Sequence, residues 1–420
     1  MAAKHKTHLE IMIIFCFLRI IESQALTLLC GDKDVRYRFL RQALDNGWVK
    51  ENSIQKRERT THSITLFSLT KKGLMYVCQS SSASLFMEMA DIATSLSIFQ
   101  KDEYGDDAKL RLAGVSTATV MALEGGASIP VEVFNRRYSF TRGEDDLLDS
   151  EDESSRPDTL REYFHRYLTE DKYVELGLFG ADEYYNGSPR MCFFDSLFVK
   201  QALSGTNNPK DARDFYKGRF RGIIQSASQV LLVYTAPPFG MSWADWVVKP
   251  ELSAIMRWQY RFASKSIKTA RKHSALLIAK NMQQLLNLYR DVDHIRKDAE
   301  TIGGRFDHLY VLTLSTWGVA TLCWLMGRSD EDILDTCLSV ITGLGLGEIN
   351  NQPSCNILHY QTSDGREAMC GLLIDIKTTA ELEHWARTHP EKDFVIFTMP
   401  DLVQFYCSTM PPNVECIVLG

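Results

Sequence analysis

The sequence predicts a mixed α+β and α/β protein in two parts, a small basic N-terminal module and a larger body. First, the chain has 420 residues, of which 45% are hydrophobic and 24% charged, enough for two or three globular cores. Second, residues 1–78 hold 13 Lys and Arg against 7 Asp and Glu, a net charge of +6, while the whole chain carries −6. Third, the N-terminal stretch has helical periodicity followed by a hairpin signal, and the last third alternates strand and helix patterns.

The composition argues against several classes of protein. No uninterrupted apolar run approaches the ~18 residues of a spanning helix, so we expect no membrane partner. The ten cysteines are scattered without C-x-x-C spacing, and several lie within apolar stretches. They are typical of small core residues in a reducing compartment, and the sequence therefore predicts a cytoplasmic protein.

The N-terminal module is predicted to have the order helix, helix, helix, hairpin, helix. Gly31 ends the second predicted helix, Asp32 or Asp34 begins the third, and Asp45-Asn-Gly47 stops it in a turn. The predicted helices cover residues 8–21, 24–29, 35–44 and 74–78, and the hairpin strands begin at Trp48 and cover Ser63–Leu69.

This order carries a family resemblance. The segments Arg36-Tyr-Arg-Phe-Leu-Arg41, Asn46-Gly-Trp-Val49 and Phe67-Ser-Leu-Thr-Lys-Lys-Gly73 resemble the signature of winged helix-turn-helix DNA binders. The resemblance implies a winged-helix domain over residues 1–82 that binds double-stranded DNA. A helix with outward cations fits the major groove, and a basic hairpin tip reaches flanking phosphates. The implied DNA-binding residues are Arg36, Arg38 and Arg41 on the helix, Lys56, Arg57 and Arg59 in the wing, and Lys71 and Lys72 after it. The alternative is a winged helix used for protein contacts or dimerisation.

The middle of the chain divides by composition. Residues 83–142 are predicted to be mostly helical, with helices over 84–96 and 115–124. Residues 143–158 contain eight acidic residues and are predicted to form a flexible loop. Residues 159–420 are predicted to form an α/β domain, with a buried strand over Gln229–Tyr234 and a long amphipathic helix over Arg271–Tyr289.

The last 120 residues carry the clearest α/β pattern. Ser363-Asp-Gly365 is a hairpin turn signal between two apolar runs. The predicted strands are 309–314, 356–361, 368–376, 393–398 and 414–419, and the predicted helices are 318–326, 379–387 and 402–407.

One candidate catalytic arrangement lies in this region. Asp364, Asp375 and Lys377 resemble the motif of PD-(D/E)xK nucleases, in which two carboxylates hold Mg²⁺ and a lysine steadies charge. Strand alternation would place Asp375 and Lys377 on one face. An active nuclease, a degenerate core of that kind and a surface salt bridge are all open. The resemblance implies Mg²⁺ as a cofactor only for the nuclease.

A second resemblance extends over most of the chain. After the winged helix come Gly218-Arg-Phe-Arg-Gly-Ile-Ile, Leu232-Val-Tyr-Thr-Ala, Met241-Ser-Trp243, Glu251, Leu373-Ile-Asp-Ile-Lys and Phe394-Val-Ile-Phe-Thr. This order is similar to that of plasmid replication-relaxation proteins of Gram-positive conjugative and mobile elements. The resemblance implies a regulator or accessory factor in DNA transfer or replication, with a relaxase or replication protein as partner. The alternatives are a metal-dependent nuclease or relaxase-like enzyme and a protein-interaction scaffold, with homodimers as a further expectation.

Overall fold

In the computed structural model, the chain forms two compact units. The first contains residues 1–205 and 221–224, and the second residues 206–220 and 225–420. The structure describes residues 6–18, 20–55, 63–79, 106–127, 129–130, 178–179, 191–196, 199, 220–226, 228–236, 251–253, 255–259, 273–290 and 306–419.

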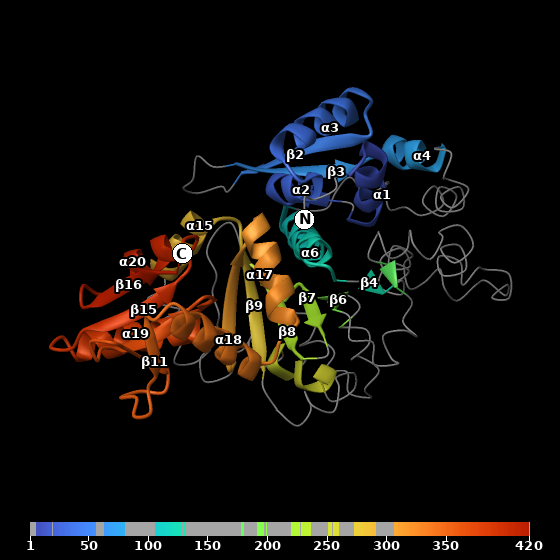
Figure 1. Ribbon diagram of the computed structural model, residues 1–420. Helices are drawn as coiled ribbons and strands as arrows, with labels where there is room; N and C mark the ends of the chain where they lie inside the picture. The colour runs from blue at the N-terminus through green and yellow to red at the C-terminus, as the bar shows by residue number, and fades with distance from the viewer. Residues whose placement is uncertain are drawn as a thin grey trace. The chain divides into compact units, whose positions relative to one another are not determined.

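Three helices begin the first unit, and all three were predicted from the sequence (Figure 1). They are α1 (His8–Leu18), α2 (Ser23–Cys30) and α3 (Lys33–Asp45). The predicted end of the first helix at residue 21 is wrong, because Ile20–Glu22 leave it and form strand β1. The two β-branched isoleucines suit a strand, and both are buried there.

The predicted hairpin is present and joins β1 in a small sheet. Strands β2 (Val49–Gln55) and β3 (Ser63–Leu69) pair antiparallel, from Val49 opposite Leu69 to Gln55 opposite Ser63. Strand β1 pairs with the other edge of β3, so the order is β1-β3-β2. Ile64 and Leu66 lie two residues apart on β3 and are both buried, so they share an apolar face of this sheet.

Helix α4 (Lys71–Gln79) packs tightly onto the start of the hairpin. The Thr70 hydroxyl donates to the carbonyl oxygens of Gly47 (2.7 Å) and Trp48 (3.0 Å) and accepts from the Gly73 amide. The Trp48 and Tyr76 rings stack with centroids 3.7 Å apart. A Cβ on Gly73 would lie 2.2 Å from the Trp48 carbonyl oxygen, so only glycine allows this approach.

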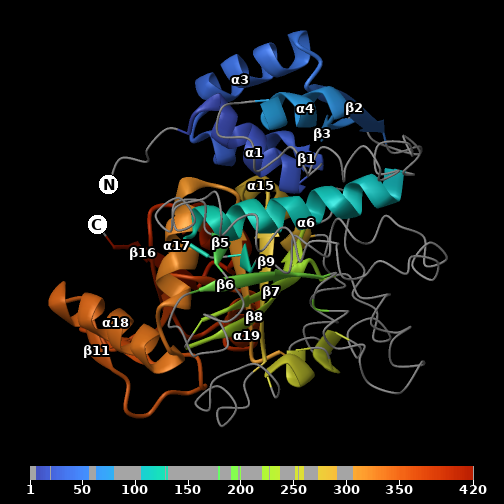
Figure 2. The same ribbon diagram turned by 90° about the vertical axis from the view of Figure 1, so that its right-hand side faces the viewer.

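Helix α6 (Asp106–Glu124) belongs to the same unit as the hairpin module (Figure 2). The Ser116 hydroxyl donates to the Leu18 carbonyl, and Lys6 forms an ion pair of 2.7 Å with Glu124. Burial raises the pKa of the Glu124 carboxyl, and Lys6 opposes that rise. The predicted helix over 115–124 is therefore confirmed, and it packs with residues assigned from the sequence to a separate domain. The short strands of this unit are β4 (Ile129–Pro130), β5 (Leu178–Phe179), β6 (Cys192–Asp195) and all but the last residue of β7 (Gly222–Gln225).

Two sheets form the second unit. In the first, β8 (Val230–Thr235), β9 (Ser274–Ala279) and β10 (His308–Thr313) run parallel, and β14 (Ile374–Asp375) pairs antiparallel with β10. The predicted helix over Arg271–Tyr289 is wrong in its first half, where β9 forms, and right in its second, where α15 forms. All six residues of β9 are buried, and the helix α15 begins only at Met282 and ends at Arg290. A continuous apolar run fits a strand buried on both faces as well as it fits a buried helix, and the strand formed.

The second sheet has the order β11-β12-β13-β15-β16. Its strands are β11 (Gly347–Ile349), β12 (Tyr360–Thr362), β13 (Glu367–Gly371), β15 (Phe394–Thr398) and β16 (Val414–Val418). The helices of this region are α17 (Thr316–Met326), α18 (Asp330–Gly343), α19 (Ile376–Thr388) and α20 (Val403–Thr409). The predicted 356–361 strand forms only from Tyr360, and the predicted 368–376 strand is split between β13 and β14, which lie in different sheets.

The fold class is therefore mixed α and β, as predicted. Across the described parts of the chain, no helix is both long enough and apolar enough to cross a membrane. The predicted helix over 84–96 and the predicted acidic loop at 143–158 lie outside the described residues.

The close approach at Gly73 gives a stability prediction. We expect Gly73→Ala to lower the free energy of unfolding of the first unit by about 1–3 kcal/mol, because its methyl group displaces the Trp48 backbone. The control is Gly343→Ala at the end of α18, where an added Cβ would meet no atom within 4 Å apart from its chain neighbours and the backbone of its own helix. It should change stability by less than about 1 kcal/mol. Urea unfolding measures both variants, and equal effects would contradict the proposed packing constraint.

Candidate functional site

The first candidate site is the α2-turn-α3 pair of the N-terminal unit. Gly31 ends α2 with a positive φ of 85°, a conformation that glycine adopts without strain. Asp32 follows at once as the N-cap of α3, and its side chain accepts a hydrogen bond of 2.7 Å from the Val35 amide. The two helices are therefore joined by a very short, well-defined turn.

Helix α3 has one buried and one exposed side. Val35, Phe39 and Ala43 are buried against the unit. The exposed residues are Lys33, Asp34, Tyr37, Arg38, Arg41, Gln42, Leu44 and Asp45. Lys33, Tyr37 and Arg41 are spaced by four residues and so share a face of the helix. The Tyr37 side chain is 65% exposed, an unusual position for a large ring.

The structure gives Arg36 a different role from its two neighbours. Its guanidinium Nη1 donates to the Ser23 hydroxyl (2.9 Å) and the Thr27 hydroxyl (2.8 Å) of α2. A longer contact of 3.4 Å reaches the Ser23 carbonyl. Arg36 thus holds α3 against α2 instead of pointing away with Arg38 and Arg41. The sequence pattern of alternating arginines gave no sign of this, because the acceptors lie on the preceding helix.

The remaining basic residues of the predicted interface divide into two groups. Lys71 and Lys72 begin α4 and are exposed. The three wing residues, Lys56, Arg57 and Arg59, lie outside the described residues, between the paired ends of β2 and β3. The described part of the interface is thus α3 with the start of α4.

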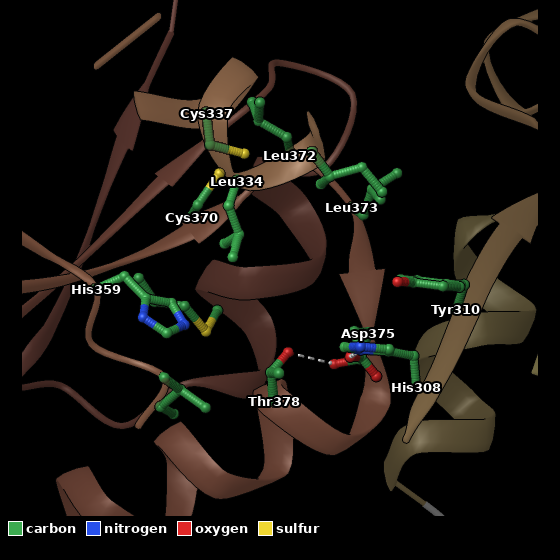
Figure 3. Close-up of a pocket in the computed structure, with 13 residues that line it drawn as sticks. His308, Tyr310, Leu334, Cys337, His359, Cys370, Leu372, Leu373, Asp375 and Thr378 are labelled. Atoms are coloured by element: carbon green, nitrogen blue, oxygen red, sulfur yellow. Dashed lines mark hydrogen bonds and ion pairs between the residues drawn. The ribbon is translucent and has the colours of Figure 1, made fainter. Parts of the chain in front are cut away.

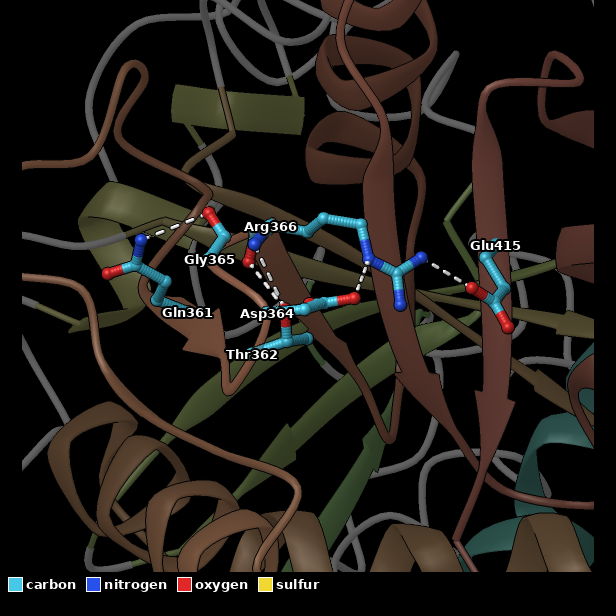
Figure 4. A network of polar contacts seen from close by, with 6 residues as sticks. All are labelled: Gln361, Thr362, Asp364, Gly365, Arg366 and Glu415. Atoms are coloured by element: carbon cyan, nitrogen blue, oxygen red, sulfur yellow. Dashed lines mark hydrogen bonds and ion pairs between the residues drawn. The ribbon is translucent and has the colours of Figure 1, made fainter.

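The second candidate site, the Asp364, Asp375 and Lys377 motif, is distributed over separate elements. Asp364 lies in the exposed turn between β12 and β13, where it accepts a hydrogen bond from the Thr362 hydroxyl (Figure 4). Its carboxylate also pairs with Arg366 at 2.8 Å, and Arg366 in turn pairs with Glu415 of β16. These hydrogen bonds and the nearby cation lower the pKa of Asp364. These contacts form a chain of ion pairs on the surface, which links the β12–β13 turn to β16.

Asp375 instead has a structural role at the start of α19. It is the N-cap of that helix, and its Oδ1 accepts from the amides of Lys377 and Leu309, both at 3.1 Å. Its Oδ2 accepts from Nδ1 of His308 at 2.9 Å (Figure 3). Lys377 is in the first turn of α19 and not on a strand, so the predicted alternation that puts both side chains on one strand face is wrong.

These residues do not fit a Mg²⁺ site. Asp364 and Asp375 have separate partners, and both Asp375 oxygens already accept from N–H groups. A cation at Asp375 would have to displace those bonds. Among the residues that the structure describes, no group of three or more His, Cys, Asp or Glu could hold a metal ion.

Comparisons with protein families, with curated proteins and with solved structures found no match to this chain.

The Arg36 contacts predict a separation of roles within α3. We expect Arg36→Ala to lower the free energy of unfolding of the N-terminal unit by about 1–2 kcal/mol, since it removes charge-assisted hydrogen bonds to α2. Arg38→Ala, an equal truncation on the exposed side, should stay within about 0.5 kcal/mol of the unchanged protein. Thermal unfolding measured in parallel tests this. Equal stability losses in the two variants would mean that Arg36 does not connect the helices.

Proposed function

We propose that the protein binds double-stranded DNA through residues 1–82 of its first unit, which act as a winged helix-turn-helix with α3 as the recognition helix. The observation that carries the proposal is the exposed side of α3, where Lys33, Arg38 and Arg41 are held outward by a buried opposite side. Arginine at such a position pairs with guanine edges in the major groove or with phosphates.

The arrangement of the unit supports this proposal. The order α1, β1, α2, α3, β2, β3 with a β1-β3-β2 sheet is typical of winged-helix proteins. The turn of Gly31 and Asp32 between α2 and α3 is short and contains a glycine, as turns of helix-turn-helix motifs often do. The hairpin strands lead into the segment that contains Lys56, Arg57 and Arg59, the expected wing contacts.

The charge distribution supports the same conclusion. A net charge of +6 in residues 1–78, within a chain of −6, concentrates the attraction to a polyanion in this N-terminal segment. Lys71 and Lys72 add exposed cations at the start of α4, and they suit phosphate contacts that carry no sequence information.

The sequence resemblance to replication-relaxation proteins supports a narrower proposal. We infer a regulator or accessory factor in DNA transfer or replication of a mobile element, acting beside a relaxase or replication protein. A homodimer bound to two half-sites is the expected form of such a factor. The nuclease alternative is not proposed, because Asp364 and Asp375 are engaged in separate structural contacts.

The proposal predicts a strong dependence of binding on α3. We expect full-length protein to bind random 30-mer duplexes with an affinity that falls steeply with salt, and enrichment sequencing to select a motif. Arg38→Ala should weaken binding to the selected motif about tenfold and relax its specificity. Lys71→Ala should weaken binding to all duplexes alike and flatten the salt dependence by about one phosphate contact.

The control is Lys392→Ala, which removes an exposed cation from the second unit. It should leave affinity and salt dependence unchanged. If Arg38→Ala and Lys392→Ala bind DNA equally, α3 is not the recognition helix. If the unchanged protein binds no duplex even at low salt, the unit is better explained by protein contacts.

A further inference from the structure

Two cysteines of the second unit line a pocket that the DNA-binding proposal does not use. Cys337 lies on α18 and Cys370 on β13, and both are free thiols. The pocket has a volume of about 220 Å³ and mostly apolar walls, with His308 and Asp375 at its polar end (Figure 3). Leu334 lines the same pocket and is 42% exposed, so the space reaches the surface. A small solute can therefore approach the two thiols.

The two thiols contact each other directly. Figure 3 shows their sulfur atoms pointing toward one another, Cys337 from the helix and Cys370 from the strand. A hydrogen bond joins the two side chains and, together with burial, raises the pKa of Cys370. Such a bond raises the pKa of the thiol that donates it, because it stabilises the protonated form. Cys370 is therefore the donor and keeps its proton, and the Cys337 Sγ is the acceptor.

The surrounding core holds the pair in this arrangement. Cys337 is 3% exposed and belongs to the apolar core of the second sheet, and Cys370 packs against that core. Next to Cys370, a Cβ on Gly371 would lie 2.7 Å from Ile396 and 2.9 Å from Tyr406, so β13 is closely packed here. The two sulfur atoms thus come from two rigid elements that already place them side by side.

We propose that Cys337 and Cys370 are a modification site, at which hydrogen peroxide entering the pocket converts the two thiols into a reversible disulfide. Sulfur atoms in hydrogen-bond contact reach the S–S bond length of about 2.05 Å by small rotations of the two side chains. The site is independent of the DNA-binding proposal, because both cysteines belong to the second unit.

The reaction consumes one peroxide for each disulfide. The Cys337 thiolate attacks a peroxide oxygen, the O–O bond breaks, and Cys337 becomes a sulfenic acid while the displaced hydroxide takes up the former thiol proton as water. The Cys370 sulfur then attacks the sulfenic sulfur, the S–O bond breaks, and the hydroxyl leaves with the Cys370 proton as a second water. The two sulfurs together lose two electrons, which the peroxide gains.

The disulfide joins parts of the fold that are otherwise held by packing. It links α18 to β13, the strand from which the chain continues into β14 of the other sheet. In a reducing compartment such a bond forms only transiently, under oxidising conditions. The modified protein therefore has a covalent tie between a helix and the second sheet that the dithiol form lacks.

The test treats the full-length protein with millimolar hydrogen peroxide, alkylates the remaining thiols and maps disulfides by mass spectrometry of unreduced peptides. We expect a peptide pair joined through Cys337 and Cys370, which disappears after dithiothreitol. Untreated protein should contain both as alkylated thiols. Cys323 on α17 is exposed, and its oxidation shows that the treatment was effective. Free thiols at both positions after such treatment would overturn the proposal, as would disulfides that join other cysteines only.

A matched pair of serine variants tests the order of attack. Cys370→Ser keeps a hydrogen-bond donor beside Cys337 but removes the second sulfur. The Cys337 sulfenic acid should then accumulate, and its labelling by dimedone should rise roughly fivefold or more. Cys323→Ser removes a thiol outside the pair and should leave the yield of the Cys337–Cys370 disulfide unchanged. Equal dimedone labelling of Cys337 in the unchanged protein and in Cys370→Ser would contradict Cys370 as its partner.

Discussion

The Arg36 guanidinium holds two helices of the N-terminal unit together, and the orientation of α3 depends on it. Because this side chain reaches back to the hydroxyls of Ser23 and Thr27, α3 is fixed on the side that faces α2. Phe39 anchors the buried side of the same helix. The residues left on the outer side, Arg38 among them, are then presented on a rigid element. A recognition helix needs that rigidity, since side chains that read base edges must be placed within fractions of an ångström.

A single carboxylate has a comparable place in the second unit. Asp375 caps α19, binds the amide at the start of β10 and orients His308. These contacts explain why the acid-x-Lys tripeptide does not fit a metal site. Both carboxylate oxygens of Asp375 already accept hydrogen bonds from N–H groups, and Lys377 lies in the first turn of α19 and not on a strand. The same contacts produce the polar end of an otherwise apolar pocket. The motif that suggested chemistry in the sequence is therefore an architectural element.

Much of the N-terminal unit could be predicted because its signals are local. Gly31 and Asp32 mark the turn between helices, and alternation marks Ser63–Leu69 as a strand. Strand β1 was missed because its three residues continue the apolar pattern of α1, and only pairing with β3 makes them a strand. The buried run Ser274–Ala279 was assigned to a helix for a similar reason. The roles of Arg36 and His308 depend on partners 13 and 67 residues away, which no local pattern reveals.

The most direct test of the central claim is hydrogen exchange of the full-length protein with and without a saturating DNA duplex. The account predicts slower exchange in peptides that cover α3 and the β2–β3 hairpin. Peptides from the second sheet of the second unit, such as those covering β15, should exchange at the same rate in both states. Slower exchange confined to the second unit, with α3 unchanged under conditions where DNA is bound, would contradict the assignment of α3 as the recognition helix.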